Sequence, residues 1–145
     1  MCSLEELLSL SDLLLAHAAA AEVDWVVMEI ADGLLQKETA ALLQCPAFTS
    51  RINFWLFATR EPLGAVGGIS LLRTWGIEPA AISGLLSMSP LGIREAEAAT
   101  GIRCITAKDL QHGKLNKQLM ETESAFAYPD SRTAIPAKAE VSTIA

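Results

Sequence analysis

Glu29, Asp32 and Gly33 stand close together in the stretch VVMEIADGLLQKET, which spans residues 26–39. An apolar run precedes the first carboxylate, and residues of helical composition follow the glycine. At the end of a buried strand, carboxylates can hold Mg²⁺ directly or through water, and a glycine lets a phosphate approach closely. We therefore take all three as candidate ligand-binding residues, and Glu29 and Asp32 as candidate Mg²⁺ ligands.

A structural interpretation of the same three residues is also open. Asp32 can be the N-cap of the helix that follows, and Gly33 can supply an unusual backbone angle. Glu29 can pair with Lys37 or with Arg60. Two carboxylates near a strand end are common, so their spacing does not decide between a metal site and a structural role.

A second candidate loop, residues 59–64, contains Arg60 and Gly64 and leads into the glycine-rich helix opening GAVGG. A helix N-terminus lined by small residues can bind an anion. The spacing matches neither G-x-G-x-x-G nor G-x-x-x-x-G-K-[ST]. We therefore favour the structural interpretation, in which the glycines let the helix pack closely on a sheet.

A third candidate loop, with the sequence SMSP, offers the hydroxyl groups of Ser87 and Ser89 near a helix start. Serine followed by proline is typical of an N-cap, which is the simpler role for Ser89. The two histidines, His17 and His112, adjoin neither serine. A Ser/His or Cys/His nucleophile therefore has little support.

Composition limits the classes of function. The chain of 145 residues has 11 Lys and Arg against 17 Asp and Glu, a formal net charge of −6, which argues against nucleic-acid binding. The scattered Cys2, Cys45 and Cys104 indicate reduced thiols and neither a disulfide framework nor a zinc site. Residues 1–21 lack a basic region and an apolar run long enough to span a bilayer. We expect a cytoplasmic protein without a membrane or nucleic-acid partner.

The hydrophobic pattern alternates between short apolar runs and longer helical segments. Helices are expected at residues 4–21, 34–43, 62–75, 90–100 and 108–123, and strands at residues 24–29, 52–58, within 79–86 and at 102–106. Pro46 is expected to stop the helix before it. Residues 1–127 then form one domain, and residues 128–145 an extended C-terminal tail.

These alternating elements predict an α/β fold, a three-layer arrangement in which a four-stranded, mostly parallel sheet has helices on both faces. Ligands bind beyond the carboxyl ends of parallel strands, so the three candidate loops are expected to meet there. The hydrophobic fraction is 51%, and the mean hydropathy is +0.33. Such values indicate either a sheet buried on both faces or an apolar surface that meets a second subunit.

The motifs resemble a known family. Residues 26–33 resemble the V-x-x-E-G-A-G-G segment of dethiobiotin synthetase-like P-loop ATPases, and residues 54–65 and 71–77 look like the strand, loop and helix that follow it. The chain looks still closer to an uncharacterised bacterial group of P-loop-type proteins with an E-x-A-D-G-L-L-Q-x-E-T motif, here residues 29–39. The resemblance covers roughly residues 4–110.

The resemblance implies a partial P-loop NTPase-like (Rossmann-like) fold, with Glu29 as the glutamate that faces Mg²⁺ and phosphate and Gly33 as the last glycine of that loop. The chain departs from the family at Ile30 and Asp32, which replace glycines, and after Leu86, where the asparagine that reads adenine is missing. No Walker A sequence occurs, so a triphosphate has no phosphate loop. The chain thus looks like the C-terminal half of such an ATPase.

Three functional hypotheses follow. The leading one is a half-domain that is not catalytic as an isolated chain and serves as an oligomerisation or ligand-binding module. A second copy, as in a homodimer, or a partner that supplies the missing N-terminal half would then cover its open sheet edge. The alternative is an ATP-utilising, Mg²⁺-dependent enzyme completed by another polypeptide, with Glu29 and Asp32 on the metal and the Ser87–Ser89 loop on the substrate. The third is a small-molecule pocket at the strand ends without chemistry.

Overall fold

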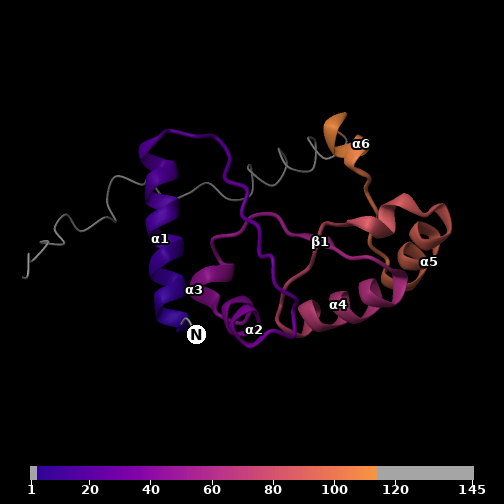
Figure 1. Ribbon diagram of the computed structural model, residues 1–145, viewed down its shortest axis with the longest axis horizontal. Coiled ribbons are helices and arrows are strands. Elements are labelled where there is room, and N and C mark those ends of the chain that lie inside the picture. The colour runs from indigo at the N-terminus through magenta and orange to yellow at the C-terminus, as the bar shows by residue number, and fades with distance from the viewer. Residues whose placement is uncertain (1–2, 114–145) are drawn as a thin grey trace, which may run out of the picture.

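The computed structural model describes residues 3–113 of the chain. In chain order the elements are α1 (Leu4–Ala20), α2 (Lys37–Leu43), α3 (Pro46–Thr49), β1 (Leu56–Ala58), α4 (Pro62–Thr74), β2 (Ala81–Ser83), the 3-10 helix η1 (Leu85–Met88), α5 (Pro90–Thr100) and α6 (Ala107–Gln111). Helix α1 lies at one end of the molecule, the strands with α4 and α5 lie at the other, and α2 and α3 lie between them (Figure 1).

The sheet confirms an α/β fold with parallel pairing, but it is smaller than the sequence predicts. Strands β1 and β2 pair in parallel, with Phe57 opposite Ile82. The strand predicted at residues 102–106 contributes a single parallel bridge between Ile82 and Cys104. Within residues 3–113, the sheet therefore has two strands and one bridged residue instead of four strands.

The strand predicted at residues 24–29 is absent from the described structure. Residues 25–31 run from α1 toward α2 without coiling (Figure 1), but they belong to no strand. No backbone hydrogen bond joins residues 24–32 to any other residue of the described chain. Burial still alternates, since Met28 and Ile30 are half-buried and Val27 and Glu29 are exposed. The segment thus has the side-chain period of a strand without a strand to pair with.

Helices α4 and α5 cover one face of the sheet. Ala65 and Ile69 from α4 and Ala96 from α5 are buried against Ile82, and Phe57 packs on the same cluster. The opposite face of β1 carries Leu56 and Ala58, both exposed. The three-layer arrangement is therefore not present among the described residues, where the second layer of helices is missing beside β1.

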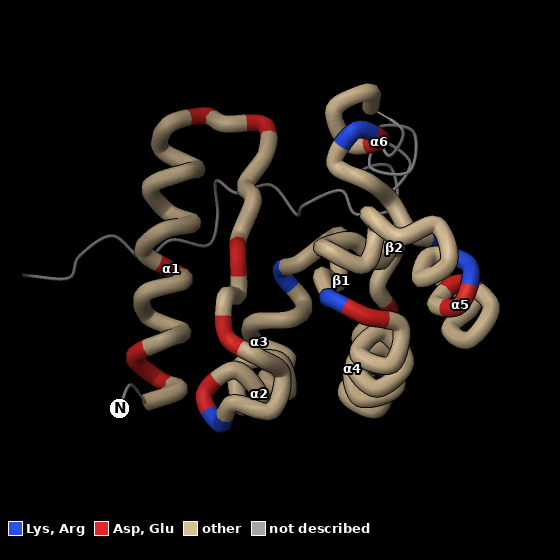
Figure 2. Tube along the Cα trace, turned by 45° about the vertical axis from the view of Figure 1, so that its right-hand side comes forward, with Lys and Arg blue, Asp and Glu red and all other residues tan. Residues whose placement is uncertain are grey.

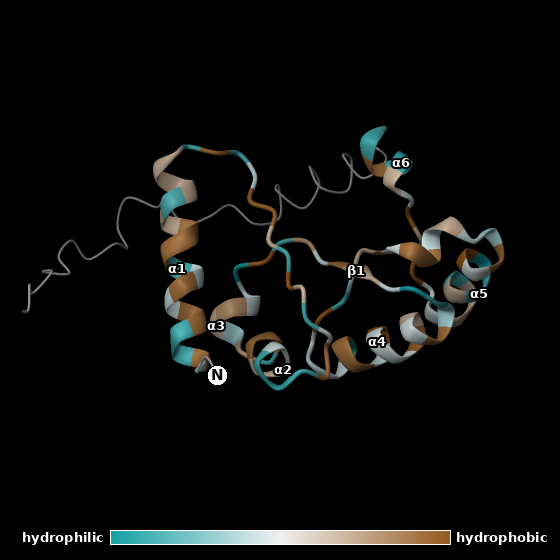
Figure 3. Ribbon diagram, in the orientation of Figure 1, coloured by the Kyte–Doolittle hydropathy of each residue, from teal (hydrophilic) through white to brown (hydrophobic). Residues whose placement is uncertain are grey.

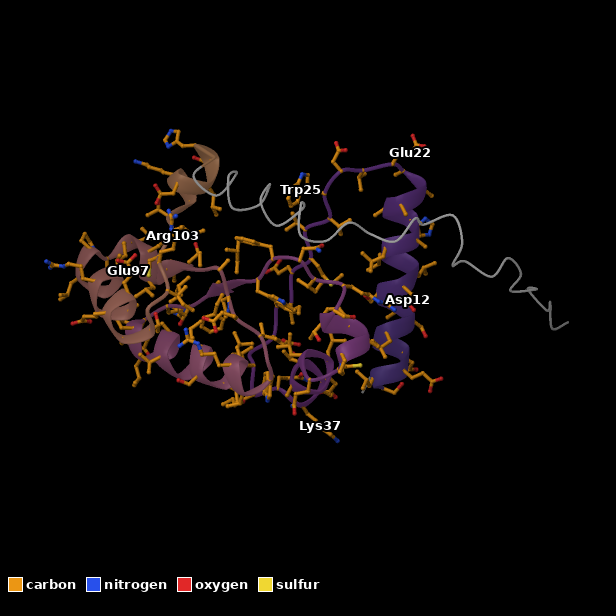
Figure 4. All side chains as sticks on the ribbon, turned by 180° about the vertical axis from the view of Figure 1, so that it is seen from behind. Asp12, Glu22, Trp25, Lys37, Glu97 and Arg103 are labelled. Carbon is orange, nitrogen blue, oxygen red and sulfur yellow. The ribbon has the colours of Figure 1, made fainter. Side chains whose placement is uncertain are left out.

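A second apolar cluster connects the rest of the chain to α4. Leu43, Phe48, Leu72 and Ile77 are its buried members. Partly buried residues pack against it, among them Leu8, Met28, Ile30, Leu34, Ile52, Trp55 and Trp75. Helix α1 also forms an ion pair through Asp12 with Arg51 (Figure 4 labels Asp12). The extended segment and α1 are thus held by side chains and not by backbone pairing.

The predicted helix boundaries are confirmed where capping residues set them. Ser3 and Glu6 form a capping box at the start of α1, as their spacing predicts. Helix α5 begins after Ser89 and ends at Gly101, which has a left-handed backbone with φ 73°. The sequence also predicts the bounds of α4 to within one residue. Most of the helix predicted at residues 108–123, and the whole tail at residues 128–145, lie outside the described residues.

One helix start is wrong, whereas the end of the same helix at Leu43 is confirmed. The helix expected from residue 34 begins at Lys37, because the side chain of Gln36 caps it by accepting a hydrogen bond from the backbone N–H of Thr39 at 2.8 Å. The helix ends before Pro46, as predicted, and Pro46 also opens α3 at its first helical position. Proline fits there because the first backbone N–H groups of a helix have no partner within the helix.

Arg73 ties the end of α4 to the end of α5. Its guanidinium donates to both carboxylate oxygens of Glu78, at 2.8 and 2.7 Å, and to the backbone oxygen of Thr100 at 3.2 Å. The hydrogen bond with Arg73 lowers the pKa of Glu78, and the paired carboxylate raises the pKa of Arg73. The pair is exposed to solvent, so it orients the two helix ends and adds little stability.

The two neighbouring glycines of α4 make a matched test of helix–sheet packing. A Cβ atom at Gly68 would lie 2.2 Å from Cζ of Phe57, whereas a Cβ atom at Gly67 would meet nothing within 4 Å. We expect Gly68→Ala to lower the free energy of unfolding by about 1–3 kcal/mol through overpacking. Gly67→Ala should raise it by about 0.5–1 kcal/mol, since alanine favours the helix. Urea unfolding measures both, and equal effects of the two substitutions would contradict this packing.

Candidate functional site

Pairing of β1 with β2 brings the second and third candidate loops together. The backbone N–H of Thr59 donates to the oxygen of Ser83 at 3.0 Å, and the N–H of Leu86 donates to the oxygen of Thr59 at 3.1 Å. Gly84 has φ 91°, and a Cβ atom there would lie 2.6 Å from the oxygen of Thr59. Glycine is thus required for the close approach of these two loops. The prediction that they share the carboxyl end of the sheet is confirmed.

Arg60 and Gly64 lie at this end for different reasons. Arg60 is exposed, and it forms no ion pair with any of the described residues. Gly64 is in the first turn of α4, where a Cβ atom would lie 2.5 Å from the Thr59 hydroxyl oxygen. Gly64 therefore permits close packing between a strand end and a helix start. This contact supports the structural interpretation of the glycine-rich helix opening.

Both candidate serines make hydrogen bonds within their own loop. The hydroxyl of Ser87 donates to the backbone oxygen of Gly84 at 2.7 Å. The hydroxyl oxygen of Ser89 accepts from the backbone N–H of Gly92 at 3.1 Å and caps α5. The cap predicted for Ser89 is confirmed. Because each hydroxyl serves the local backbone, neither is positioned by a base for nucleophilic attack.

The first candidate loop does not join the other two. Ile30 and Leu34 lie on either side of Asp32 in the chain, and they pack against the apolar cluster whose buried members include Leu72 and Ile77. Leu72 belongs to the last turn of α4, and Ile77 comes before β2. Those contacts place the loop near the amino ends of the strands. The expectation that all three loops meet at the carboxyl ends is therefore wrong.

Glu29, Asp32 and Gly33 are all exposed. Asp32 is not the cap of α2, because Gln36 fills that role. Gly33 has no positive φ, and its backbone oxygen closes a turn by accepting from the N–H of Gln36 at 2.9 Å. Neither Lys37 nor Arg60 pairs with Glu29 within residues 3–113, and Lys37 points away from the ribbon (Figure 4). The structural roles considered for these residues are not observed.

Metal and thiol chemistry gain no support from the geometry. Among the described residues, no three His, Cys, Asp or Glu side chains lie together as metal ligands. Burial raises the pKa of the Cys104 thiol, and the charge of Glu97 raises it further. The backbone N–H of Cys104 donates to the Glu97 carboxylate at 2.8 Å. A thiol with a raised pKa is a poor nucleophile at neutral pH.

The structure adds a surface that the sequence pattern concealed. Trp25, Val26 and Val27 are 47%, 49% and 95% exposed, although an apolar run without alternation is typical of a buried strand. Leu56 on β1 is 45% exposed. Apolar colour also extends along much of α1 (Figure 3). The apolar run at residues 24–29 is the sequence signal for this surface. Composition alone does not show whether another helix or strand of the chain covers it.

Comparison with known proteins leaves the resemblance as a prediction. No protein-family model matches the chain, and no curated protein or solved structure matches it significantly. No helix among the described residues is both long and apolar enough to cross a membrane.

A substitution at Ser89 separates its capping role from a ligand-binding role. Ser89→Ala should lower the free energy of unfolding by about 1 kcal/mol, because the N–H of Gly92 loses its acceptor. Ser89→Asp should retain most of the stability, since aspartate is an equally good N-cap residue. Thermal unfolding measures both. A loss with aspartate as large as that with alanine would contradict the capping role.

Proposed function

We propose that the chain is a cytoplasmic half-domain related to P-loop ATPases, which is not catalytic by itself and acts as an oligomerisation or binding module. Another polypeptide chain completes its sheet toward the four-stranded, three-layer form that the sequence predicts. That chain is either a second copy or a partner that carries the missing N-terminal half. Residues 26–39 and the glycine-rich opening of α4 support the family relation by their resemblance to those ATPases.

One observation supports the proposal most strongly. Among the described residues, one edge of β1 has no partner strand, and one face of β1 has no covering layer. Its only neighbour among the described strands is β2, so its other edge has no partner there. Leu56 also lies exposed on a face that no helix of residues 3–113 covers. An unpaired strand edge beside exposed apolar side chains is a template for another chain. A module that completes its sheet on association accounts for both features.

The alternative remains an ATP-utilising, Mg²⁺-dependent enzyme completed by another polypeptide. Under it, Glu29 and Asp32 hold the metal, the Ser87–Ser89 loop contacts the substrate, and the other polypeptide supplies the phosphate loop. The separation of the first loop from the other two disfavours it for the isolated chain. A partner that completed the sheet would have to move that loop to the carboxyl ends of the strands.

Self-association tests the incomplete strand directly. Light scattering after size-exclusion chromatography should show a mass that rises with protein concentration. Leu56→Lys should weaken this association about tenfold or more, since burying a leucine side chain contributes about 1.5–3 kcal/mol. The lysine would also place a charge beside the unpaired edge.

Leu110→Lys is the matched control, because Leu110 lies in α6 and is 40% exposed, close to the 45% of Leu56. This control should associate like the unaltered chain. A strict monomer at high protein concentration would count heavily against an oligomerisation module. If Leu56→Lys and Leu110→Lys weakened self-association equally, β1 would be excluded as the site of association.

Calorimetric titration with MgATP separates the proposal from the alternative. We expect no binding by the isolated chain, because a triphosphate needs a phosphate loop and the sequence has no Walker A motif. Clear binding that is lost in Glu29→Gln would overturn the non-catalytic interpretation. Glu95→Gln, a substitution of another exposed glutamate, is the control for a general effect of charge.

A further inference from the structure

The chain between α1 and α2 combines acidic and exposed apolar residues, and we name residues 22–32 the acidic segment. It contains Glu22, Asp24, Glu29 and Asp32 and has no lysine or arginine. Figure 2 shows these acidic residues along the tube with no basic residue among them. Between the carboxylates lie Val23, Trp25, Val26 and Val27, all exposed. Figure 4 labels Glu22 and Trp25 on this part of the chain.

The backbone of the acidic segment lacks the partners that an extended chain normally has. Within residues 3–113, residues 24–32 neither donate nor accept a backbone hydrogen bond. Met28 and Ile30, both half-buried, pack against the described apolar cluster that includes Leu72. Extended backbone with unpaired N–H and C=O groups can take up a further strand by β-augmentation. Such pairing would also cover the exposed valines and Trp25.

Charge decides which occupant fits this segment. None of its four carboxylates forms an ion pair or side-chain hydrogen bond within the described chain. Two copies pairing at this segment would bring two sets of carboxylates together, and the whole chain is itself acidic, with a net charge of −6. Like charges on neighbouring strands are destabilising. A strand with lysine or arginine residues neutralises the segment and is attracted to it over a longer range.

We propose that the acidic segment is a docking site for a cationic amphipathic strand of a partner protein, in which basic and apolar residues alternate. The inference rests on the proposed function as a binding module, and it adds the chemistry of a partner that binds at the acidic segment, apart from β1. Main-chain hydrogen bonds to residues 24–32 supply the pairing, the carboxylates select basic side chains, and the exposed apolar residues contact the apolar ones.

Titration calorimetry on the full chain tests the proposal with a defined probe. The probe is a capped peptide of alternating lysine and valine, as long as residues 24–32. A second peptide has the same sequence with alternate backbone nitrogens methylated, so it keeps the charge and loses the donors needed for strand pairing. We expect the first peptide to bind at low salt and to bind less tightly as salt rises. The methylated peptide should bind at least about tenfold more weakly.

Charge reversal locates the site. The double substitution Asp24→Lys and Glu29→Lys should weaken peptide binding about tenfold or more, through two lost attractions and two new repulsions. The control Glu95→Lys reverses an exposed charge on α5 and should leave binding unchanged. Circular dichroism checks that each variant is folded. Since every described helix lies outside the acidic segment, the spectra should match that of the unaltered chain.

Each contrary result overturns the proposal in a recognisable way. If the unaltered chain does not bind the lysine–valine peptide, either another part of the chain covers the acidic segment or the segment does not pair with an added strand. Equal binding of the two peptides, or equal effects of the two charge variants, means general attraction to an acidic protein. Peptide affinity that falls as protein concentration rises identifies a second copy as the occupant. The light-scattering experiment at Leu56 fails or succeeds independently, so the two proposals can be told apart.

Discussion

Backbone N–H and C=O groups need hydrogen-bond partners from their own helix, from a neighbouring strand or from water, and this requirement governs the described structure. Helices meet it within themselves, and α1, α4 and α5 are accordingly well formed. Strand β1 meets it on one side, through β2. Residues 24–32 do not meet it at all within residues 3–113. Exposed apolar side chains, among them Trp25, Val27 and Leu56, lie where backbone pairing is incomplete, which is the physical basis for an association function.

The face of the sheet that α4 and α5 cover shows which contacts the exposed face lacks. On one face, Gly68 lets α4 approach Phe57 closely, and Ala65, Ile69 and Ala96 fill the space against Ile82. On the other face, Ala81 and Ile105 form a small cluster with Phe54, and no described helix extends it over Leu56. An added layer or strand would bury apolar area that is now in water. This gain is the driving force that we assign to association.

Sequence reasoning succeeded where local interactions decide the outcome. The capping box at Ser3, the cap at Ser89 and the left-handed Gly101 are each specified by a few neighbouring residues. It failed where the outcome depends on distant partners. The apolar run at residues 24–29 has strand composition, but a strand exists only when a second one pairs with it. The same limit misplaced Glu29 and Asp32, because loops meet at a common sheet edge only when all their strands join the sheet.

Amide hydrogen exchange on the full chain tests the central claim most directly, which is that residues 24–32 have no backbone partner in the free protein. At low protein concentration, we expect their amides to exchange within about tenfold of the rate of an unstructured peptide. Amides in the middle of α4, from Ala65 to Leu72, should be strongly protected, since they are hydrogen-bonded within a buried helix. Protection of residues 24–32 equal to that of α4, and independent of protein concentration, would contradict the account.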